Sequence, residues 1–272
     1  MSFKSIIKSI FSYNPKKDYY FDILDDSQNY SNIPVLNEKK ENIYPSLFKN
    51  LEYIKTSYNT LINSDIVIRE FTLTIQKKMY NAFLFYIDGM IDSNLLNTSI
   101  LNPLMLKKCS SNEKIITKTK NNIIIKKFPK FDLSNYLLYC LIPQNNISKK
   151  DNFKDLFNGV NSGNCALFVD TLNVAFDIEI KGFKQRSINS PNNEVVIKGA
   201  QEAFVENLRT NTSIIRRIIN NENLIIENID VGNITKTKCA ICYMKNITNS
   251  NLVAEVKFRM NNLKIDSLTS SR

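Results

Sequence analysis

The chain has 272 residues, of which 43% are apolar and 23% charged; this composition is that of a folded globular protein and excludes a largely disordered one. It contains no histidine, which excludes Ser–His and Cys–His catalysis and every metal site that needs an imidazole. The net charge of +10 permits an acidic partner, nucleic acid or an anionic membrane, but a solvated surface rich in lysine explains the same balance.

The N-terminal region has the pattern of a tail. Apolar residues recur at helical spacing from Phe3 to Phe11, with Lys4 and Lys8 beside them, which predicts a short amphipathic helix with basic flanks. Such a helix can lie on a membrane surface or dock on protein. Residues 12–45 are polar and contain three prolines, so we expect a flexible linker.

Hydrophobic periodicity then predicts a helix, two strands and a second helix. These elements cover residues 46–61, 65–74, 80–88 and 93–106 in turn. The first strand allows a bulge between Arg69 and Phe71. The second strand is apolar on both faces, which is typical of a buried central strand. Ser93 is the expected cap of the second helix.

The rest of the chain begins with a basic stretch and continues with alternating helices and strands. Residues 107–130 hold eight lysines and no arginine. The pattern then predicts helices at 133–142, 153–160, 200–219 and 249–263, and strands at 164–172, 174–181, 224–229 and 238–245. The expected apolar stripe of the longest helix consists of Phe204, Leu208, Ile215 and Ile219.

The order of these elements predicts an α/β (α+β) fold with a flexible tail, residues 1–45, and two subdomains, residues 46–145 and 146–272. Each subdomain is expected to hold a small mixed sheet with packed helices. Both contain the order helix, strand, strand, helix, which indicates a repeated unit. Chance similarity between short amphipathic elements is the alternative to a true repeat.

The five cysteines do not indicate a metal or redox centre. Cys239 and Cys242 form a C-x-x-C motif on a predicted strand, where residues three apart point to opposite faces. No second such motif completes a zinc site, so we expect ordinary packed side chains and no cofactor. The odd number of cysteines and the absence of a signal peptide predict a reduced, cytoplasmic chain.

Two further patterns have both a functional and a structural interpretation. Phe83 and Phe85 lie on a strand of a basic protein, as in single-strand RNA-binding sheets, but their apolar neighbours favour core packing. Asp88, Asp92 and Asp170 are expected in turns and helix caps. Because no catalytic constellation remains, we predict that the chain is not an enzyme.

Arginine is scarce, at seven residues, and five of the seven lie between residues 186 and 259. Planar, bidentate pairing is the property that distinguishes arginine from lysine. Candidate ligand or subunit contacts in this part of the chain are Arg186, Glu194, Arg209, Asn211, Arg216 and Arg217. Structural ion pairs with Glu194, Glu202 and Glu206 are the alternative.

Two expectations follow from these candidates. Arg216 and Arg217 diverge by about 100° on a helix, so at least one of them should pair with a carboxylate inside the domain. The loop from Arg186 to Glu194 should border a crevice between the subdomains. A helix beginning near Gly199 would present free N–H groups to an anion there, although Arg186 and Glu194 can instead pair with each other.

Residues 181–219, KGFKQRSINSPNNEVVIKGAQEAFVENLRTNTSIIRRII, resemble the bacterial spore germinant receptor A subunits of the GerA family. The shared pattern is an Arg, then Pro-x-x-Glu, then a Gly before a Phe-x-Glu helix with Thr-Asn-Thr and Arg-Arg. Further agreement comes from the segments NSDIVIREF (63–71), YIDGMID (86–92), ILNPLM (100–105) and DVGNITKTKCAICYM (230–244). The similarity covers about residues 47–266.

The resemblance implies an integral membrane receptor of the spore inner membrane, with this soluble region on the cytoplasmic side. It implies B and C subunits and further A subunits as partners, a small nutrient ligand, and an ion channel that opens in germination. The chain departs from the family in two ways: the membrane-embedded half is missing, and Thr171 replaces the Gly that follows Asp170. We therefore expect a role in coupling and assembly; the alternative is a basic α/β module that binds nucleic acid.

Overall fold

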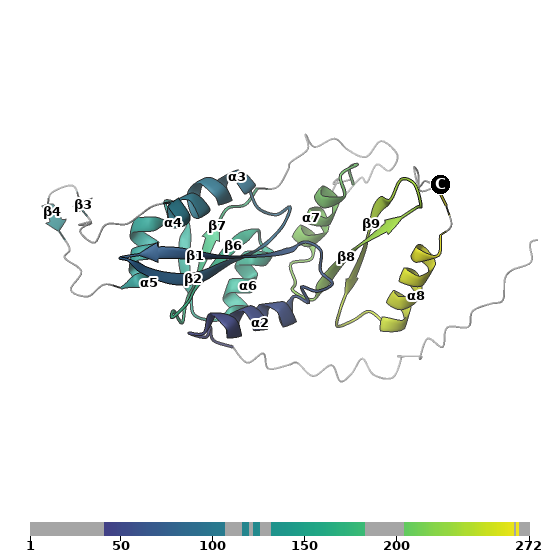
Figure 1. Cartoon of the computed structure of the whole chain (residues 1–272), viewed down its shortest axis with the longest axis horizontal. Helices are drawn as coiled ribbons and strands as arrows, with labels where there is room; N and C mark the ends of the chain where they lie inside the picture. Colours follow the sequence, from purple (N-terminus) through teal and green to yellow (C-terminus); the bar gives the residue numbers. More distant parts are fainter. Residues whose placement is uncertain are drawn as a thin grey trace, which may run out of the picture. The chain divides into compact units, whose positions relative to one another are not determined.

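Five antiparallel strands form the central sheet of the chain (Figure 1). The computed structural model describes residues 41–106, 116–119, 122–125, 132–182, 204–263 and 265–266. The sheet has the order β1-β2-β6-β7-β5. Its strands are β1 (Ile66–Ile75), β2 (Lys78–Ile87), β5 (Ile147–Lys150), β6 (Asn164–Val169) and β7 (Ala175–Glu179). The α/β class is therefore confirmed, and the predicted N-terminal helix lies outside the described residues.

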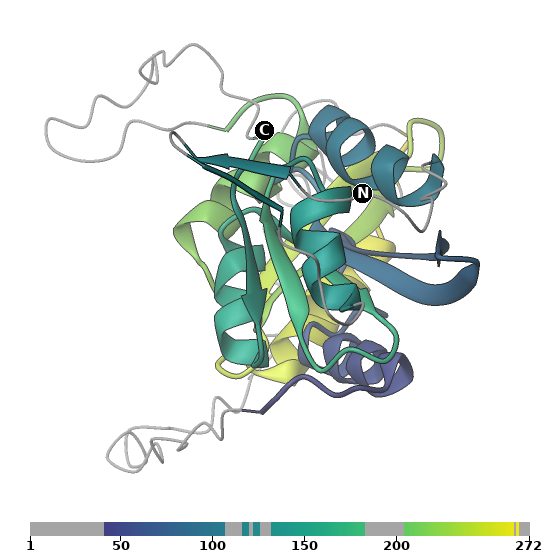
Figure 2. The same cartoon turned by 90° about the vertical axis from the view of Figure 1, so that its left-hand side faces the viewer.

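Helices cover both faces of this sheet (Figures 1 and 2). One face carries α3 (Ser93–Leu95), η3 (Leu96–Leu101), α4 (Asn102–Leu106), α5 (Leu133–Tyr136) and η4 (Leu137–Leu141). The other face carries α2 (Leu47–Ser57) and α6 (Phe153–Asn161). Each face has its own cluster of buried apolar side chains, so the sheet is the middle layer of three.

The strand predicted to be buried and central, β2, is an interior strand of the sheet, between β1 and β6. In β2, Leu84 packs with the first cluster and Phe83 and Phe85 with the second, and all three side chains are fully buried. This confirms the prediction of core packing and removes the two rings from any nucleic-acid surface. The bulge expected in β1 is wrong, because Arg69, Glu70 and Phe71 pair one to one with residues of β2.

Side-chain hydrogen bonds mark the starts of several helices. The Asn152 side chain accepts a hydrogen bond from the Asp155 N–H at 2.8 Å, which begins α6. The helix then buries Phe153, Leu156, Phe157 and Val160 at the spacing of one face. Asp92, and not Ser93, caps α3, since its carboxylate accepts from the N–H groups of the next turn. The predicted cap was one residue too late.

A second, smaller sheet follows. Its two strands, β8 (Leu224–Val231) and β9 (Thr237–Met244), pair antiparallel, and the neighbouring helices are α7 (Leu208–Ile218) and α8 (Ser250–Asn261). Figure 1 shows the hairpin between these two helices. A third sheet consists of β3 (Ile116–Thr119) and β4 (Asn122–Ile125), which pair antiparallel within the basic stretch.

The helix predicted over 200–219 differs in extent and orientation. α7 begins at Leu208, where the Asn207 side chain caps it, and residues 200–203 lie outside the described part of the chain. Phe204 precedes the helix and is 64% exposed. The buried face of α7 consists of Thr212, Ser213 and Arg216, so the predicted apolar stripe is wrong. Polar contacts, described below, hold this helix.

The two predicted helix–strand–strand–helix units are present in chain order but occupy different surroundings. β2 pairs with β1 and β6, whereas β9 pairs with β8 alone among the described strands. The expectation that the second strands are equivalent is therefore wrong. The division near residue 145 stays a prediction, although strands from both sides of that position share the five-stranded sheet. In the described ranges, no helix is both long enough and apolar enough to cross a membrane.

Candidate functional site

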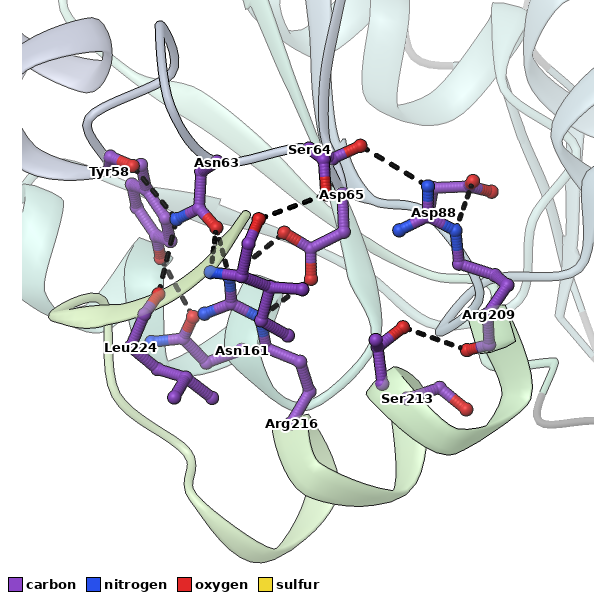
Figure 3. A network of polar contacts seen from close by, with 12 residues as sticks. Tyr58, Asn63, Ser64, Asp65, Asp88, Asn161, Arg209, Ser213, Arg216 and Leu224 are labelled. Carbon is purple, nitrogen blue, oxygen red and sulfur yellow. Dashed lines mark hydrogen bonds and ion pairs between the residues drawn. The ribbon is translucent and has the colours of Figure 1, made fainter. Parts of the chain in front are cut away.

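A network of polar contacts connects α7 and β8 to the loop that precedes β1 (Figure 3). We call it the α7 joint and define it by Asn63, Asp65, Asp88, Arg209 and Arg216. Two of these residues, Arg209 and Arg216, were predicted as contact residues. They lie seven residues apart on α7, which places them on one side of the helix two turns apart.

Arg216 and Asp65 form the buried centre of the α7 joint. The Arg216 Nε donates to Asp65 Oδ2 at 2.8 Å, and Nη2 donates to Asp65 Oδ1 at 2.9 Å. The side chains are 2% and 1% exposed. This fork-to-fork geometry is the planar pairing that arginine provides and lysine does not. Nη1 of Arg216 has no hydrogen-bond partner in the described part of the chain.

Asn63 connects the ion pair to the second sheet. Its Oδ1 accepts from Arg216 Nη2 at 2.9 Å and from the Ile226 N–H at 2.8 Å. Its Nδ2 donates to the carbonyls of Tyr58 at 3.0 Å and Leu224 at 3.1 Å. All four hydrogen-bonding positions of the amide are used, so Asn63 connects the end of α2, the last turn of α7 and the start of β8.

Ser64 adds a second connection to β8. Both its backbone N–H and its hydroxyl donate to the carbonyl of Ile226, at 2.8 and 2.9 Å. Leu224, Ile225 and Ile226 are themselves buried. The first three residues of β8 are therefore held by packing and by hydrogen bonds to the loop before β1.

Arg209 and Asp88 form the outer part of the α7 joint. Their Nε and Oδ2 atoms lie 3.0 Å apart, and Arg209 Nη2 donates to the Ser64 carbonyl at 3.2 Å. Gly89 has a φ of +85°, and a Cβ there would lie 3.0 Å from Cγ and Cδ of Arg209. Glycine thus allows both the turn and the close approach of the arginine stem.

The pKa shifts of groups near Arg216 and Asp65 agree with a structural role for this buried pair. Burial, followed by the nearby Asp65 carboxylate, raises the pKa of Cys242 on β9, while Arg216 lowers it. Burial raises the pKa of Tyr58 well above its usual value, and its hydroxyl donates to Asn161 Oδ1 at 2.9 Å. These groups stay protonated at neutral pH, so neither is an available thiolate or phenolate nucleophile.

The predicted contact residues have different outcomes. The expectation that Arg216 or Arg217 pairs within the domain is confirmed by Arg216. Asn211 bonds both the N–H and the carbonyl of Val205 at 2.7 Å, closing the turn before α7. Arg186 and Glu194 lie outside the described residues, and so does Glu202. The predicted role of all six residues in ligand or subunit contact stays a prediction.

Sequence reasoning missed the acidic partners and Asn63. Asp65 is 151 positions from Arg216, and no local pattern pairs them. The available signals were the polar residues Asn63 to Asp65 directly before an apolar strand, the scarcity of arginine, and the presence of these residues in the family-like segment 63–71. Those features mark polar residues that need a buried partner, but they do not identify it.

A groove beside the start of α2 is a second surface feature. Its volume is about 610 Å³, and α2 and the β1–β2 hairpin line it. Glu70 and Asp170 supply two carboxylates, and Phe48, 65% exposed, supplies an apolar wall. None of the four predicted contact residues that the structure describes lines this groove. Elsewhere in the described ranges, no three potential metal ligands gather.

Comparison with known proteins identifies relatives over most of the chain. Residues 52–272 match the family model described as Bacillus/Clostridium GerA spore germination protein. Spore germination protein KA of Bacillus subtilis (strain 168) is 30% identical over 229 residues, which are 84% of this chain and 38% of that protein. Spore germination protein B1 of the same organism is 28% identical over 225 residues, covering 83% and 42%. The chain thus spans about two fifths of these relatives.

A solved structure shares the fold. It is the crystal structure of the N-terminal domain of the A subunit of the Bacillus megaterium spore germinant receptor GerK3. The TM-score is 0.57 and the identity 26%, over 82% of this chain and 74% of that chain.

Proposed function

Since this chain belongs to the Bacillus/Clostridium GerA family of spore germination proteins, we propose that it serves as the N-terminal domain of a germinant receptor A subunit. In this role it couples nutrient sensing to receptor assembly and ion release without catalysing a reaction. The observation that carries the proposal is the likeness to the GerK3 domain, which covers most of both chains. The family relationship extends over residues 52–272 and supports the same role.

The α7 joint supports coupling as the mechanism. A signal passes between two parts of a domain only when movement of one part is transmitted to the other. Buried, bidentate pairing of Arg216 with Asp65 and the fully used amide of Asn63 resist relative movement of the two sheets. The arrangement is therefore suited to transmit displacement, and it offers no activated nucleophile.

The proposed partners and location follow the family. The partners are receptor B and C subunits and further A subunits, with a small nutrient as ligand of the assembled receptor. The proposed location is the cytoplasmic side of the spore inner membrane. The loop between Arg186 and Glu194 remains the proposed contact for a ligand or a neighbouring subunit.

Germination of spores from the source organism tests the proposal. Deleting the gene should slow the fall in optical density that follows nutrient addition, and restoring the natural gene should reverse the defect. Arg209→Glu should reproduce the slow response, because it places a negative charge against Asp88. Arg259→Glu is the matched control, since Arg259 pairs with Glu255 on the exposed face of α8.

Receptor abundance must be measured in the same spores. A slow response of Arg209→Glu at natural abundance supports coupling, and a slow response with lost protein supports a role in assembly. If deletion leaves germination unchanged with every nutrient that triggers it, the receptor role is wrong.

A further inference from the structure

The strand β9 has an edge that differs from the two edges of the five-stranded sheet. β9 pairs with β8 on one side, and no described strand pairs with its other side. At the edges of the larger sheet, β5 is four residues long and carries Lys149 and Lys150, and β1 carries exposed Arg69 and Glu70. Short length and charge are the usual protections of an edge against pairing.

β9 carries such a charge only near its start, at the exposed Lys238. It is eight residues long, its register with β8 is regular, and residues 239–244 carry no charge. All six are partly exposed, so neighbouring elements do not fully cover them. An edge of this kind is a template for a further strand, because its outward N–H and C=O groups can bond a partner backbone.

The β8–β9 register shows which backbone groups of β9 are available to a further strand. The Lys245 N–H bonds the Asn223 carbonyl at 2.9 Å, so the odd-numbered residues of β9 bond β8. The even-numbered residues Lys238, Ala240 and Cys242 direct their N–H and C=O groups outward. At Met244 only the N–H is available, because its carbonyl accepts from the N–H groups of Ile247 and Thr248, at 3.2 and 2.9 Å. An antiparallel partner strand must bond these residues through residues whose own N–H and C=O groups face β9.

We propose that β9 pairs antiparallel with β9 of a second copy of this chain, about a two-fold axis at Ile241. In a pair of identical strands, even-numbered residues lie opposite even-numbered residues only when the two-fold axis passes through a residue. An axis at Ile241 sets Ala240 opposite Cys242 and Lys238 opposite Met244, so no like charges meet. The four strands then form one sheet, β8-β9-β9-β8, with a self-complementary interface.

The alternative axis at Ala240 is less suitable. It would set Lys238 opposite Cys242, which faces the α7 joint and is half-buried. Placing the axis at Ile241 keeps lysine at the end of the paired segment, where its ammonium reaches water. The pairing concerns the chain by itself, so it can fail while the receptor role holds.

Oligomeric state is the first test. Light scattering across a dilution series of the full chain should show a dimer that dissociates on dilution. Ala240→Pro should give a monomer with an unchanged β8–β9 hairpin, because the lost N–H points outward. A monomer at every concentration, or a dimer unaffected by Ala240→Pro, would overturn the proposal.

Disulfide trapping tests the axis directly. In a background with Cys239→Ser and Cys242→Ser, Ile241→Cys should form a covalent dimer on oxidation, since the two residues form a non-bonded pair with Cα atoms about 4.5 Å apart. Ile229→Cys on β8 is the matched control and should remain monomeric. Equal trapping of both variants, or no trapping of Ile241→Cys, rejects the pairing. Slow amide exchange of β9 in a monomer would also reject it, because the chain itself would then cover this edge.

Discussion

The side chains of Arg216 and Asp65 are almost fully removed from water, at 2% and 1% exposed, so each is the other's main source of stabilisation. Arg216→Ala would leave a buried carboxylate without its partner. We expect it to lower the free energy of unfolding by about 3–5 kcal/mol. Chemical denaturation measures this, with Arg259→Ala as control, whose exposed pair should contribute less than about 1 kcal/mol. Equal losses in both variants would contradict a special role for the buried pair.

Thr171 has a left-handed backbone. Its φ of 73° is uncommon for any residue with a Cβ and more so for a β-branched one. Thr171→Gly should raise the melting temperature, by an amount that corresponds to about 1 kcal/mol of unfolding free energy. The substitution releases backbone strain of about 1–3 kcal/mol, and the greater conformational entropy of glycine in the unfolded chain offsets part of this gain. Asp170→Gly, at a position without positive φ, should lower it. A lower melting temperature for Thr171→Gly would show that the threonine side chain has a stabilising contact.

Asp177 predicts a pH dependence of stability. Burial raises the pKa of this carboxyl, while the Asn164 amide, which donates to it at 2.8 Å, and Lys150 and Lys181 lower the pKa. Gly159 of α6 makes room for it, since a Cβ there would lie 2.5 Å from the carboxylate. The folded state thus binds its proton more tightly than the unfolded state does.

The sign of the effect follows from that difference. The contribution of Asp177 is most favourable below its unfolded pKa, about 3.9, and is lost as pH rises through the raised folded value. Asp177→Asn should therefore raise the unfolding free energy at pH 7, and this gain should shrink as pH falls toward 4. Denaturation curves at several pH values measure it. A gain that does not change with pH would assign the effect to packing.

Single residues also show the reach of sequence reasoning. The scarcity of arginine indicated bidentate pairing, and the prediction that Arg216 or Arg217 pairs within the domain is confirmed by Arg216. The partner itself could not be predicted, because Asp65 lies on another element and the pairing depends on how α7 meets the loop before β1. Arg217, its neighbour, carries the same sequence signal, so the sequence did not distinguish the two.

Among the elements, α7 shows where helical periodicity misleads. The apolar residues of 204–219 follow helical spacing, yet the buried face consists of Thr212, Ser213 and Arg216. The apolar pattern assumes that burial is driven by hydrophobic transfer, whereas here hydrogen bonds and an ion pair compensate the burial of polar groups. β2, whose two faces pack against apolar clusters, obeys the pattern, and its central position was predicted correctly.

The start of α7 provides a test of this difference. Asn207→Ala should lower the unfolding free energy by about 1 kcal/mol, because the Asn207 side chain accepts from the Thr210 N–H at 3.1 Å. Phe204→Ser should change it by less than about 0.5 kcal/mol, since Phe204 lies outside the helix on the surface. If Phe204→Ser costs more than Asn207→Ala, the helix extends upstream and the predicted apolar stripe was correct.

At the scale of the whole molecule, most strands could be predicted but their partners could not. β2 pairs with β6, which lies some eighty residues later, and β5 pairs with β7 at the far edge. The pairing of strands this far apart in the sequence depends on tertiary packing, which the alternation of apolar and polar residues within one strand does not reveal. For the same reason the helix–strand–strand–helix units looked alike in sequence although β2 is interior and β9 is at an edge.

The central claim is that the α7 joint makes the two sheets move as one body, as coupling requires. Amide hydrogen exchange tests it most directly. In the natural chain, β8 amides such as that of Ile226, which bonds Asn63 at 2.8 Å, should be protected as strongly as those of β6. In Arg216→Ala, exchange in β8 should become faster while β6 is unchanged. If β8 already exchanges much faster than β6 in the natural chain, the two sheets open independently and the account is contradicted.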